Sequence, residues 1–328
     1  KSSEETTPED PRLALLLSTL RKEFGAESVV SFTDKALPGT EFISSSCVSL
    51  DKALGGGWAK GRIIEAFGPE SSGKTTVTLH AIAEVQRRGG LAAFIDAEHA
   101  LDLNYAKALG VQTDKLLFSQ PNSGEEALQI VEHMVRSGIV ELIVVDSVAA
   151  LTPAAEIEGS IGDSHMGLQA RLMSQAMRKL AGICHTSKCS ILFTNQIRMK
   201  IGVFFGSPET VSGGQALKFY ASQRVDIRRI GTIKENDVAK ANTIKVKVVK
   251  NKVAPPFREA ELTIVFGQGL DHVRDAIRLG SDANLIDKAG SWYSYQGERI
   301  AHGEDAAVEY FKANPDKLQT IKDQLSAS

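Results

Sequence analysis

The sequence has few cysteines, little net charge and no long apolar run. Its three cysteines, Cys47, Cys184 and Cys189, form no paired disulfide framework. Cys184 and Cys189 also lack the paired spacing of a zinc site, so reduced thiols are expected. No apolar stretch approaches membrane-spanning length, so we expect no membrane partner. The net charge of −2 excludes a chain that is basic throughout.

The composition is that of an ordinary globular protein, with 42% hydrophobic and 24% charged residues. A length of 328 residues accommodates one large domain with appendages, or two domains. The first residue is Lys1 rather than Met, which indicates that an N-terminal segment was removed; a cleaved transit peptide is one alternative.

One short stretch is locally basic and contains few acids. Such a stretch is compatible with nucleic acid, with an acidic partner or with a solvated surface, and the pattern alone favours the solvated surface. Its basic residues are Arg224, Arg228, Arg229, Lys234, Lys240, Lys245, Lys247, Lys250 and Lys252.

An amphipathic helix is predicted ahead of the main domain. Thr7 is its expected N-cap and Pro8 its first residue, with acids in the first turn. The apolar side chains of this helix form one stripe along it. This stripe must be buried, either on the chain's own domain, which is the default, or on a neighbouring subunit. Its apolar positions at helical spacing are Leu13, Leu16, Leu17, Leu20 and Phe24.

From about residue 60, short Val/Ile/Leu runs alternate with helical segments. This pattern predicts an α/β fold with a mostly parallel sheet that is buried on both faces. In such sheets ligands bind at the carboxyl ends of the strands. The expected strands are Arg62–Phe67, Leu91–Ile95, Leu142–Val145 and Ile191–Thr194, and the expected helices are Thr75–Arg88 and Ser123–Ser137.

In three later segments apolar and polar residues alternate, as they do in strands, and after them the sequence pattern changes. Arg224–Arg229, Thr243–Lys250 and Glu261–Phe266 are expected to extend the sheet. After about residue 270, short helices surround the segment Ser291–Gly297, which predicts a small α+β C-terminal domain. We therefore expect an N-terminal helix and linker at 1–35, a core at 36–270 and a C-terminal domain at 271–328.

The segment Gly68-Pro-Glu-Ser-Ser-Gly73-Lys74-Thr75 matches the phosphate-binding P-loop pattern in full. A strand-like run precedes it and a helix-forming segment follows it, as the mechanism requires. Backbone N–H groups and the helix N-terminus would hold phosphate oxygens. Lys74 would contact the terminal phosphates and the Thr75 hydroxyl would hold Mg²⁺.

Polar residues at other strand ends converge on the same place. Asp146 ends a buried strand, and beside a full P-loop we favour a magnesium ligand over a turn former. Asp96 and Glu98 end another strand, and either carboxylate could activate the attacking water. Gln196 ends a fourth strand, where an amide can detect the γ-phosphate.

At this point the sequence resembles the bacterial RecA recombinase family over nearly its whole length. Generic P-loop proteins share only the first of the matching strings, so the match is specific. The strings are Gly68–Thr76, Phe94–Asp102, Val144–Pro153, Ala154–Gly159, Gln175–Leu180, Asn195–Gly202, Ala216–Ser222 and Lys250–Lys252.

The resemblance implies a RecA-type ATPase that uses ATP and Mg²⁺. It selects Glu98 over Asp96 as the residue that activates water, and it makes Gln196 the link to a DNA-binding loop. It places Lys250 and Lys252 on ATP bound to the neighbouring subunit, in the manner of an arginine finger. The nucleotide-binding residues that it implies are Gly68, Pro69, Glu70, Ser71, Ser72, Gly73, Lys74, Thr75, Thr76, Asp102, Tyr105, Phe266 and Gly267.

The resemblance also implies two DNA-binding loops, at about 158–166 and 197–211. Glycine-rich segments next to basic residues would follow a phosphate backbone, while Met166 and Ile201 would wedge between bases. From residues alone, a plain surface connection is the stronger interpretation of each loop. The DNA-contacting residues implied are Met166, Arg171, Ser174, Arg178, Arg198, Lys200, Ile201, Glu209, Gly213 and Gly214.

In the same way the resemblance implies head-to-tail helical filaments on single-stranded DNA, and pairing with double-stranded DNA. The subunit interface would join Leu13, Leu16, Leu17 and Leu20 to Lys218 and Phe219. Gly231–Lys245 resembles the surface that promotes self-cleavage of a LexA-type repressor. A cytoplasmic, nucleoid-associated location is expected, with an organelle as the alternative.

Four features depart from the family pattern. They are Ser160 in place of an acid, Phe266 in place of tyrosine, the unusual Trp58–Gly61, and the absence of an acidic tail. None removes a catalytic group. A ring-forming helicase motor and a small-molecule phosphotransferase stay open as other functions for a P-loop chain.

Overall fold

The computed structural model describes residues 10–25, 29, 39–161, 165, 167–199 and 208–327. The chain divides into two units, Lys1–Thr40 and Glu41–Ser328, which are described separately. In the described part of the chain, no helix combines the length and the apolar character that crossing a membrane requires.

The first unit contains α1 (Pro11–Phe24). Its N-cap is Asp10, whose side chain accepts a hydrogen bond of 3.0 Å from the backbone of Arg12. The expectation of a helix start at Thr7 and Pro8, which lie outside the described residues, is therefore wrong. Asp10-Pro11 repeats the same cap-then-proline pattern three residues later, and the helix begins there. None of the residues of α1 is buried, and Leu13 and Leu16 of its leucine stripe are exposed.

The second unit is built on one large, mostly parallel sheet, as predicted. Its strand order is β12-β11-β10-β9-β3-β7-β6-β4-β5, and every neighbouring pair from β9 to β5 is parallel. In this order the strands are Gly269–Leu270, Glu259–Val265, Val238–Asn251, Gln223–Glu235, Ile63–Gly68, Ser190–Met199, Val140–Asp146, Leu91–Asp96 and Leu117–Ser119.

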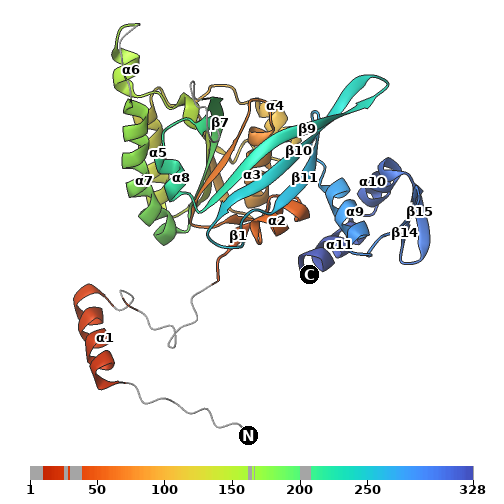
Figure 1. Cartoon of the computed structure of the whole chain (residues 1–328), viewed down its shortest axis with the longest axis horizontal. Coiled ribbons are helices and arrows are strands. Elements are labelled where there is room, and N and C mark those ends of the chain that lie inside the picture. The colour runs from red at the N-terminus through yellow and green to blue at the C-terminus, as the bar shows by residue number, and fades with distance from the viewer. Residues whose placement is uncertain are drawn as a thin grey trace. The chain divides into compact units, whose positions relative to one another are not determined.

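Helices cover both faces of this sheet (Figure 1). Alternate residues of each strand face opposite ways, so Ile64 and Leu192 pack with α2 (Val48–Leu54) and α3 (Lys74–Arg87). Ile63 and Ile191 pack with α5 (Gly124–Ser137) and α7 (Leu168–Ser187). Burial on both faces explains the continuous apolar runs in the sequence.

The remaining elements of the core are short. They are β1 (Phe42–Ile43), β2 (Trp58–Ala59), α4 (Leu103–Ala108), a 3₁₀ turn (Val148–Ala150), α6 (Ala154–Glu158), β8 (Glu209–Val211) and α8 (Ala216–Tyr220). Strand β8 pairs antiparallel with the end of β7, with Ile197 opposite Val211, and so closes the base of the second predicted loop.

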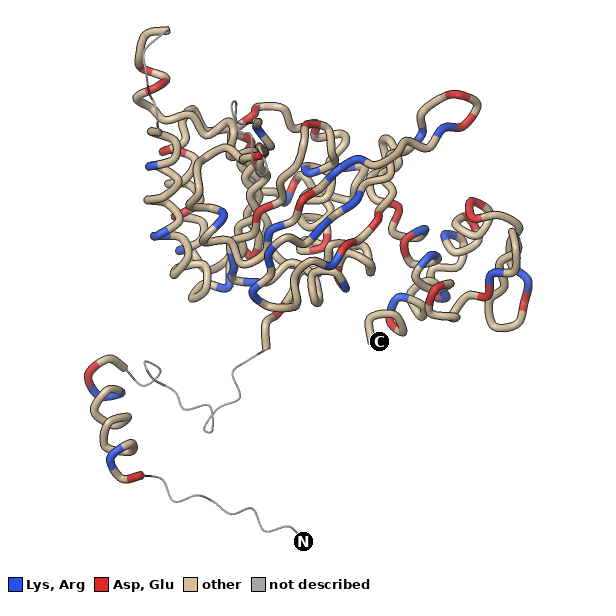
Figure 2. The backbone as a smooth tube through the Cα atoms, in the orientation of Figure 1, with Lys and Arg blue, Asp and Glu red and all other residues tan. Residues whose placement is uncertain are grey.

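The basic stretch forms β9 and β10, which are longer than the sequence pattern predicted (Figure 2). Acids from other elements neutralise much of it. Arg228 is paired with Glu209 at 2.6 Å, and Lys245 with Glu259 at 2.8 Å. Arg224 is buried rather than exposed. The excess of basic residues in this stretch is therefore largely cancelled in the fold.

The C-terminal segment forms a small α+β domain, as predicted. Helices α9 (His272–Asp282), α10 (Glu304–Ala313) and α11 (Pro315–Ala327) lie beside a three-stranded sheet of β13 (Asp287–Ala289), β14 (Trp292–Tyr295) and β15 (Glu298–His302), as Figure 1 shows. Its own core centres on buried residues that include Ile277, Phe311 and Ile321, with Val48 of α2 joining from the main domain.

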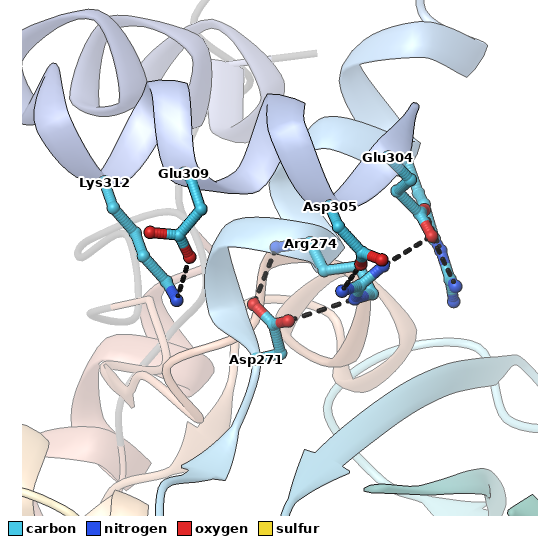
Figure 3. A network of polar contacts seen from close by, with 7 residues as sticks. Asp271, Arg274, Glu304, Asp305, Glu309 and Lys312 are labelled. Atoms are coloured by element: carbon cyan, nitrogen blue, oxygen red, sulfur yellow. Dashed lines mark hydrogen bonds and ion pairs between the residues drawn. The ribbon is translucent and has the colours of Figure 1, made fainter. Parts of the chain in front are cut away.

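An ion-pair network fastens α9 to α10 within this domain (Figure 3). The Arg274 guanidinium donates to Asp271 at 3.0 Å, to Glu304 at 2.6 Å and to Asp305 at 2.7 Å. The Arg274 side chain is only 14% exposed, so these contacts are partly shielded from water. A partly buried cation with three carboxylate partners contributes more than an exposed pair.

We predict that Arg274→Ala destabilises this domain by about 1–3 kcal/mol, because the partly buried carboxylates of Asp271 and Glu304 each lose a charged donor. The matched control is Lys312→Ala, which removes the exposed pair with Glu309 on α10 and should cost at most about 1 kcal/mol. Thermal unfolding of both variants measures the difference. Equal melting temperatures would show that the network does not stabilise the domain.

Candidate nucleotide and nucleic-acid site

The phosphate loop connects β3 to α3, and its glycines are required by close contacts. A Cβ atom at Gly68 would lie 2.1 Å from the carbonyl oxygen of Ile227. A Cβ atom at Gly73 would lie 2.4 Å from Cδ1 of Ile264, at a φ of +95° that disfavours other residues. The loop is thus pressed against β9 and β11, and its shape is fixed by them.

The loop has the features of an anion site. Lys74 Nζ donates to the carbonyl oxygens of Pro69 at 2.7 Å and Gly68 at 3.3 Å, so its charge lies over the loop. Burial lowers the pKa of Lys74, which increases the benefit of an anionic partner. The buried Ser72 Oγ has no hydrogen-bond partner among the described residues. With the N-terminus of α3 facing the loop, these groups fit a polyphosphate.

Thr75 and Asp146 meet as the magnesium prediction requires. Thr75 Oγ1 donates to Asp146 Oδ2 at 2.6 Å, and Thr194 Oγ1 donates to the other carboxylate oxygen. Burial raises the pKa of Asp146, while the two hydroxyl donors act in the opposite direction. A hydroxyl and a buried carboxylate beside the phosphate loop fit a Mg²⁺ ion. Sequence reasoning missed Thr194, which was expected to end its strand but lies within β7, since that strand continues to Met199.

Glu98 and Gln196 also meet. Gln196 Nε2 donates to Glu98 Oε1 at 3.0 Å, and the Ser147 hydroxyl donates to the same oxygen. The backbone N–H of Ala97 bonds the carbonyl of Asp146 at 2.8 Å, which joins the ends of β4 and β6. These contacts bring Glu98 and Gln196 next to the end of β6, and the catalytic roles of these residues stay predictions. Sequence reasoning missed Ser147, which directly follows Asp146.

Asp96 has a different environment from Glu98. Its carboxylate accepts hydrogen bonds from the backbone of Ala100 at 3.2 Å and Leu101 at 3.1 Å, and from Gln120 Nε2 at 3.0 Å. It is 2% exposed. Asp96 thus holds the loop after β4 in place, and this geometry favours Glu98 as the carboxylate that faces the site.

A cavity of about 280 Å³ continues from the phosphate loop. Tyr105 and the half-exposed Phe266 line it, and the Tyr105 hydroxyl lies 2.9 Å from Thr76 Oγ1. Asp102 and Gly267 do not line it; Asp102 instead caps α4. Their contact with the nucleotide stays a prediction. Sequence reasoning missed three further lining residues, which the distant strands β10 and β11 contribute: Asn242, Ile244 and Ile264.

Lys250 lies away from the phosphate loop of its own chain. In the sheet, Lys250 on β10 lies opposite Arg224 on β9, and Arg224 lies opposite Glu65 on β3. By strand spacing, its Cα lies roughly 14 Å from that of Gly68. Lys250 Nζ donates to the carbonyls of Lys218 and Phe219, each at 2.8 Å, at the end of α8. Burial, with nearby Lys252, lowers the pKa of Lys250 to about 8.

These lysines share one face with the predicted interface. Phe219 is 67% exposed and Lys218 is exposed, next to the Lys250 side chain. The backbone of Lys252 donates to the carbonyl of Ser222 at 2.9 Å. Contact of Lys250 and Lys252 with a nucleotide on another subunit stays a prediction. The face that carries Lys218 and Phe219 is exposed, as such a contact requires.

The predicted DNA-contacting residues divide into four groups, the last of which lies on the return side of the second loop. Arg171, Ser174 and Arg178 lie along α7 at helical spacing, and Arg178 donates to Ser174 at 3.3 Å. Arg198 Nε donates to Ser212 Oγ at 2.9 Å at the loop base. Met166, Lys200 and Ile201 lie outside the described residues.

The return side of the second loop is packed rather than free. Glu209 holds Arg228 through two hydrogen bonds of 3.0 and 2.6 Å. Gly213 is buried against Val148 and Met173, and Gly214 lies against Ala170. Glu209 thus anchors the return side on β9, and the two glycines pack it against α7; contact between these residues and DNA stays a prediction.

Comparison with known proteins identifies two domains. The model of the RecA N-terminal domain matches residues 12–271, and that of the RecA C-terminal domain matches residues 274–328. A protein from Geobacter metallireducens, named Protein RecA, is 55% identical over 322 residues, covering 98% of this chain and 95% of the relative. Proteins of the same name from Acinetobacter baylyi and Psychrobacter arcticus are 58% and 56% identical, covering 92% and 96% of this chain and 87% and 90% of the relatives.

We predict that Gly73→Ala weakens ATP binding by roughly tenfold or more, equivalent to about 1.4 kcal/mol, because its Cβ would displace the loop from Ile264. Gly110→Ala is the matched control, since Gly110 has a φ of +92° and its Cβ would meet no atom closer than 3.8 Å. Titration with a fluorescent ATP analogue measures both affinities. Equal affinities would refute the packing argument.

Proposed function

The chain belongs to the RecA family, and from this premise we propose that it is a DNA-dependent ATPase that forms helical filaments on single-stranded DNA. In these filaments it would catalyse homologous pairing and strand exchange with double-stranded DNA during recombinational repair. The observation that carries the proposal is the convergence of four side chains beside the phosphate loop: Thr75 at the start of α3, Asp146 at the end of β6, Glu98 just after β4 and Gln196 on β7. That convergence lies beside the base of the second predicted DNA loop.

We propose Glu98 as the general base. Ser147 and Gln196 both donate to its Oε1 and so fix the orientation of the carboxylate, which leaves Oε2 to take a proton from water. ATP bound with Mg²⁺ supplies the phosphoryl group when present. Lys74 and Thr75 would hold the phosphates and the metal ion, together with Asp146.

Gln196 supplies the proposed link to DNA. It lies on β7, and the next residue, Ile197, pairs with Val211 of β8 at the base of the second loop. A change in the contacts of Gln196 therefore acts on a strand end that leads directly into that loop. Arg171, Arg178 and Arg198 would contribute salt-sensitive, sequence-neutral contacts with the phosphate backbone.

Subunit assembly would complete the site. The leucine stripe of α1, in which Leu13 and Leu16 are exposed, would dock on the neighbouring protomer, and Lys250 and Lys252 would reach the ATP of that neighbour. The distance of Lys250 from its own phosphate loop supports a role in trans. We further propose a cytoplasmic, nucleoid-associated location and a LexA-type repressor as a partner at Gly231–Lys245.

The function is tested by measuring ATP turnover with and without single-stranded DNA while imaging the same samples by electron microscopy. We expect DNA to stimulate turnover and to produce open helical filaments. Closed rings would indicate a helicase-type motor. Turnover that is indifferent to DNA, without polymers, would indicate a small-molecule phosphotransferase.

The role of Glu98 is tested by a pair of variants. We predict that Glu98→Gln lowers kcat roughly 10²- to 10⁴-fold while ATP affinity and melting temperature are unchanged. Asp96→Asn should instead lower stability by about 1–3 kcal/mol, because a buried hydrogen-bonding carboxylate is lost, and retain measurable turnover. Loss of ATP binding in Glu98→Gln would contradict its assignment as base.

A further inference from the structure

A buried ion pair lies beneath the nucleotide site and has no part in the chemistry described above. Arg224 Nε on β9 donates to Glu65 Oε2 on β3 at 2.5 Å. Glu65 is 0% exposed, and the Arg224 guanidinium lies 4.6 Å from the centre of the Phe67 ring. Burying two charges costs several kcal/mol per ion, and an apolar pair of similar volume is often as stable. Stability alone therefore does not account for this pair.

The second oxygen of Glu65 holds Asn195. Asn195 Nδ2 donates to Glu65 Oε1 at 2.9 Å and also to the carbonyl oxygen of Ser212 at 3.0 Å. Asn195 Oδ1 accepts from the backbone N–H of Gln196 at 2.9 Å. The carboxylate accepts only, so it requires the NH₂ end of the amide to face it. Both hydrogens and the oxygen of the Asn195 amide are thus engaged, and its orientation is fixed.

The three segments that Asn195 joins are the ones that the proposed function must connect. Strand β3, which carries Glu65, runs three residues later into the phosphate loop at Gly68. Gln196 follows Asn195 and contacts Glu98. Ser212 directly follows β8, on the return side of the second loop, and its hydroxyl accepts from Arg198 Nε on the outgoing side.

We propose that Glu65 and Arg224 are positioning residues that hold Asn195 as a clamp between the phosphate-loop strand and both sides of the second loop. The clamp makes the return side of this loop move with the phosphate loop, so that nucleotide binding is transmitted to the DNA-binding surface. The inference rests on the proposed function and deepens it, because it assigns the coupling to named buried groups. Arg224 also neighbours Lys250 across β9 and β10, which places the clamp beside the face proposed to reach the next protomer.

The test is a double variant, Glu65→Leu with Arg224→Met, in the full chain. It removes both charges together at similar volume, which avoids the penalty of an unpaired buried charge. The first readout is hydrogen–deuterium exchange of the amides at 208–213, with and without a non-hydrolysable ATP analogue. In the wild type we expect the analogue to slow this exchange; in the variant we expect the effect to vanish while the analogue still binds.

The second readout is the ratio of ATP turnover with single-stranded DNA to turnover without it. We expect this ratio to fall at least tenfold in the double variant, within the usual range of about 5- to 150-fold for coupled sites, while turnover without DNA is retained. The matched control is Glu132→Gln with Arg136→Gln, which removes an exposed ion pair of 2.8 Å on α5. The control should match the wild type in both readouts.

A second variant covers the case in which the double variant does not fold. Asn195→Ala leaves the ion pair in place but removes its link to Ser212, so it should give the same loss of both effects. A nucleotide-dependent exchange change that persists at 208–213 in either folded variant would overturn the clamp. A wild type whose turnover ignores DNA would instead refute the proposed function, and the exchange readout would still decide the clamp because it needs only nucleotide.

Discussion

The geometry of the candidate nucleotide site depends on one buried carboxylate, that of Asp146 at the end of β6. Its two side-chain oxygens accept hydrogen bonds from Thr75 at the start of α3 and Thr194 on β7, and its backbone carbonyl accepts from Ala97 after β4. One residue thus joins the ends of three neighbouring strands and the helix that follows the phosphate loop. Burial raises its pKa, so the site favours whatever cation or donor compensates its charge.

Much of this site could be predicted from the sequence, because the relevant signals are local. The glycines, Lys74 and Thr75 of the phosphate loop occupy fixed spacings between a strand and a helix. Asp146 and Gln196 end apolar runs, and in a parallel sheet such ends lie at one edge. The order of the strands was not predicted: β3 and β4 are joined by α3 along the chain, yet β7 and β6 lie between them in the sheet.

The parts that the sequence did not predict are contacts between distant segments. Asn242 and Ile264 reach the nucleotide cavity from strands far along the chain, and no spacing rule signals them. The acids that neutralise the basic stretch likewise come from other elements. The pairing of Glu65 with Arg224 spans 159 residues, and an isolated glutamate within a strand carries no pattern that indicates its partner. Even the start of α1 was misplaced, since two equivalent cap-then-proline signals compete.

The central claim is that the nucleotide site is completed by two protomers, with Glu98 from one and Lys250 from the next. Mixing two variants, Glu98→Gln and Lys250→Ala, tests it most directly in the presence of ATP and single-stranded DNA. Each variant alone should be nearly inactive, whereas a random head-to-tail mixture restores about one quarter of the intact sites. We therefore expect the ATP turnover of the mixture to recover to about one quarter of the wild-type rate. A mixture no more active than its components would contradict a site shared between protomers.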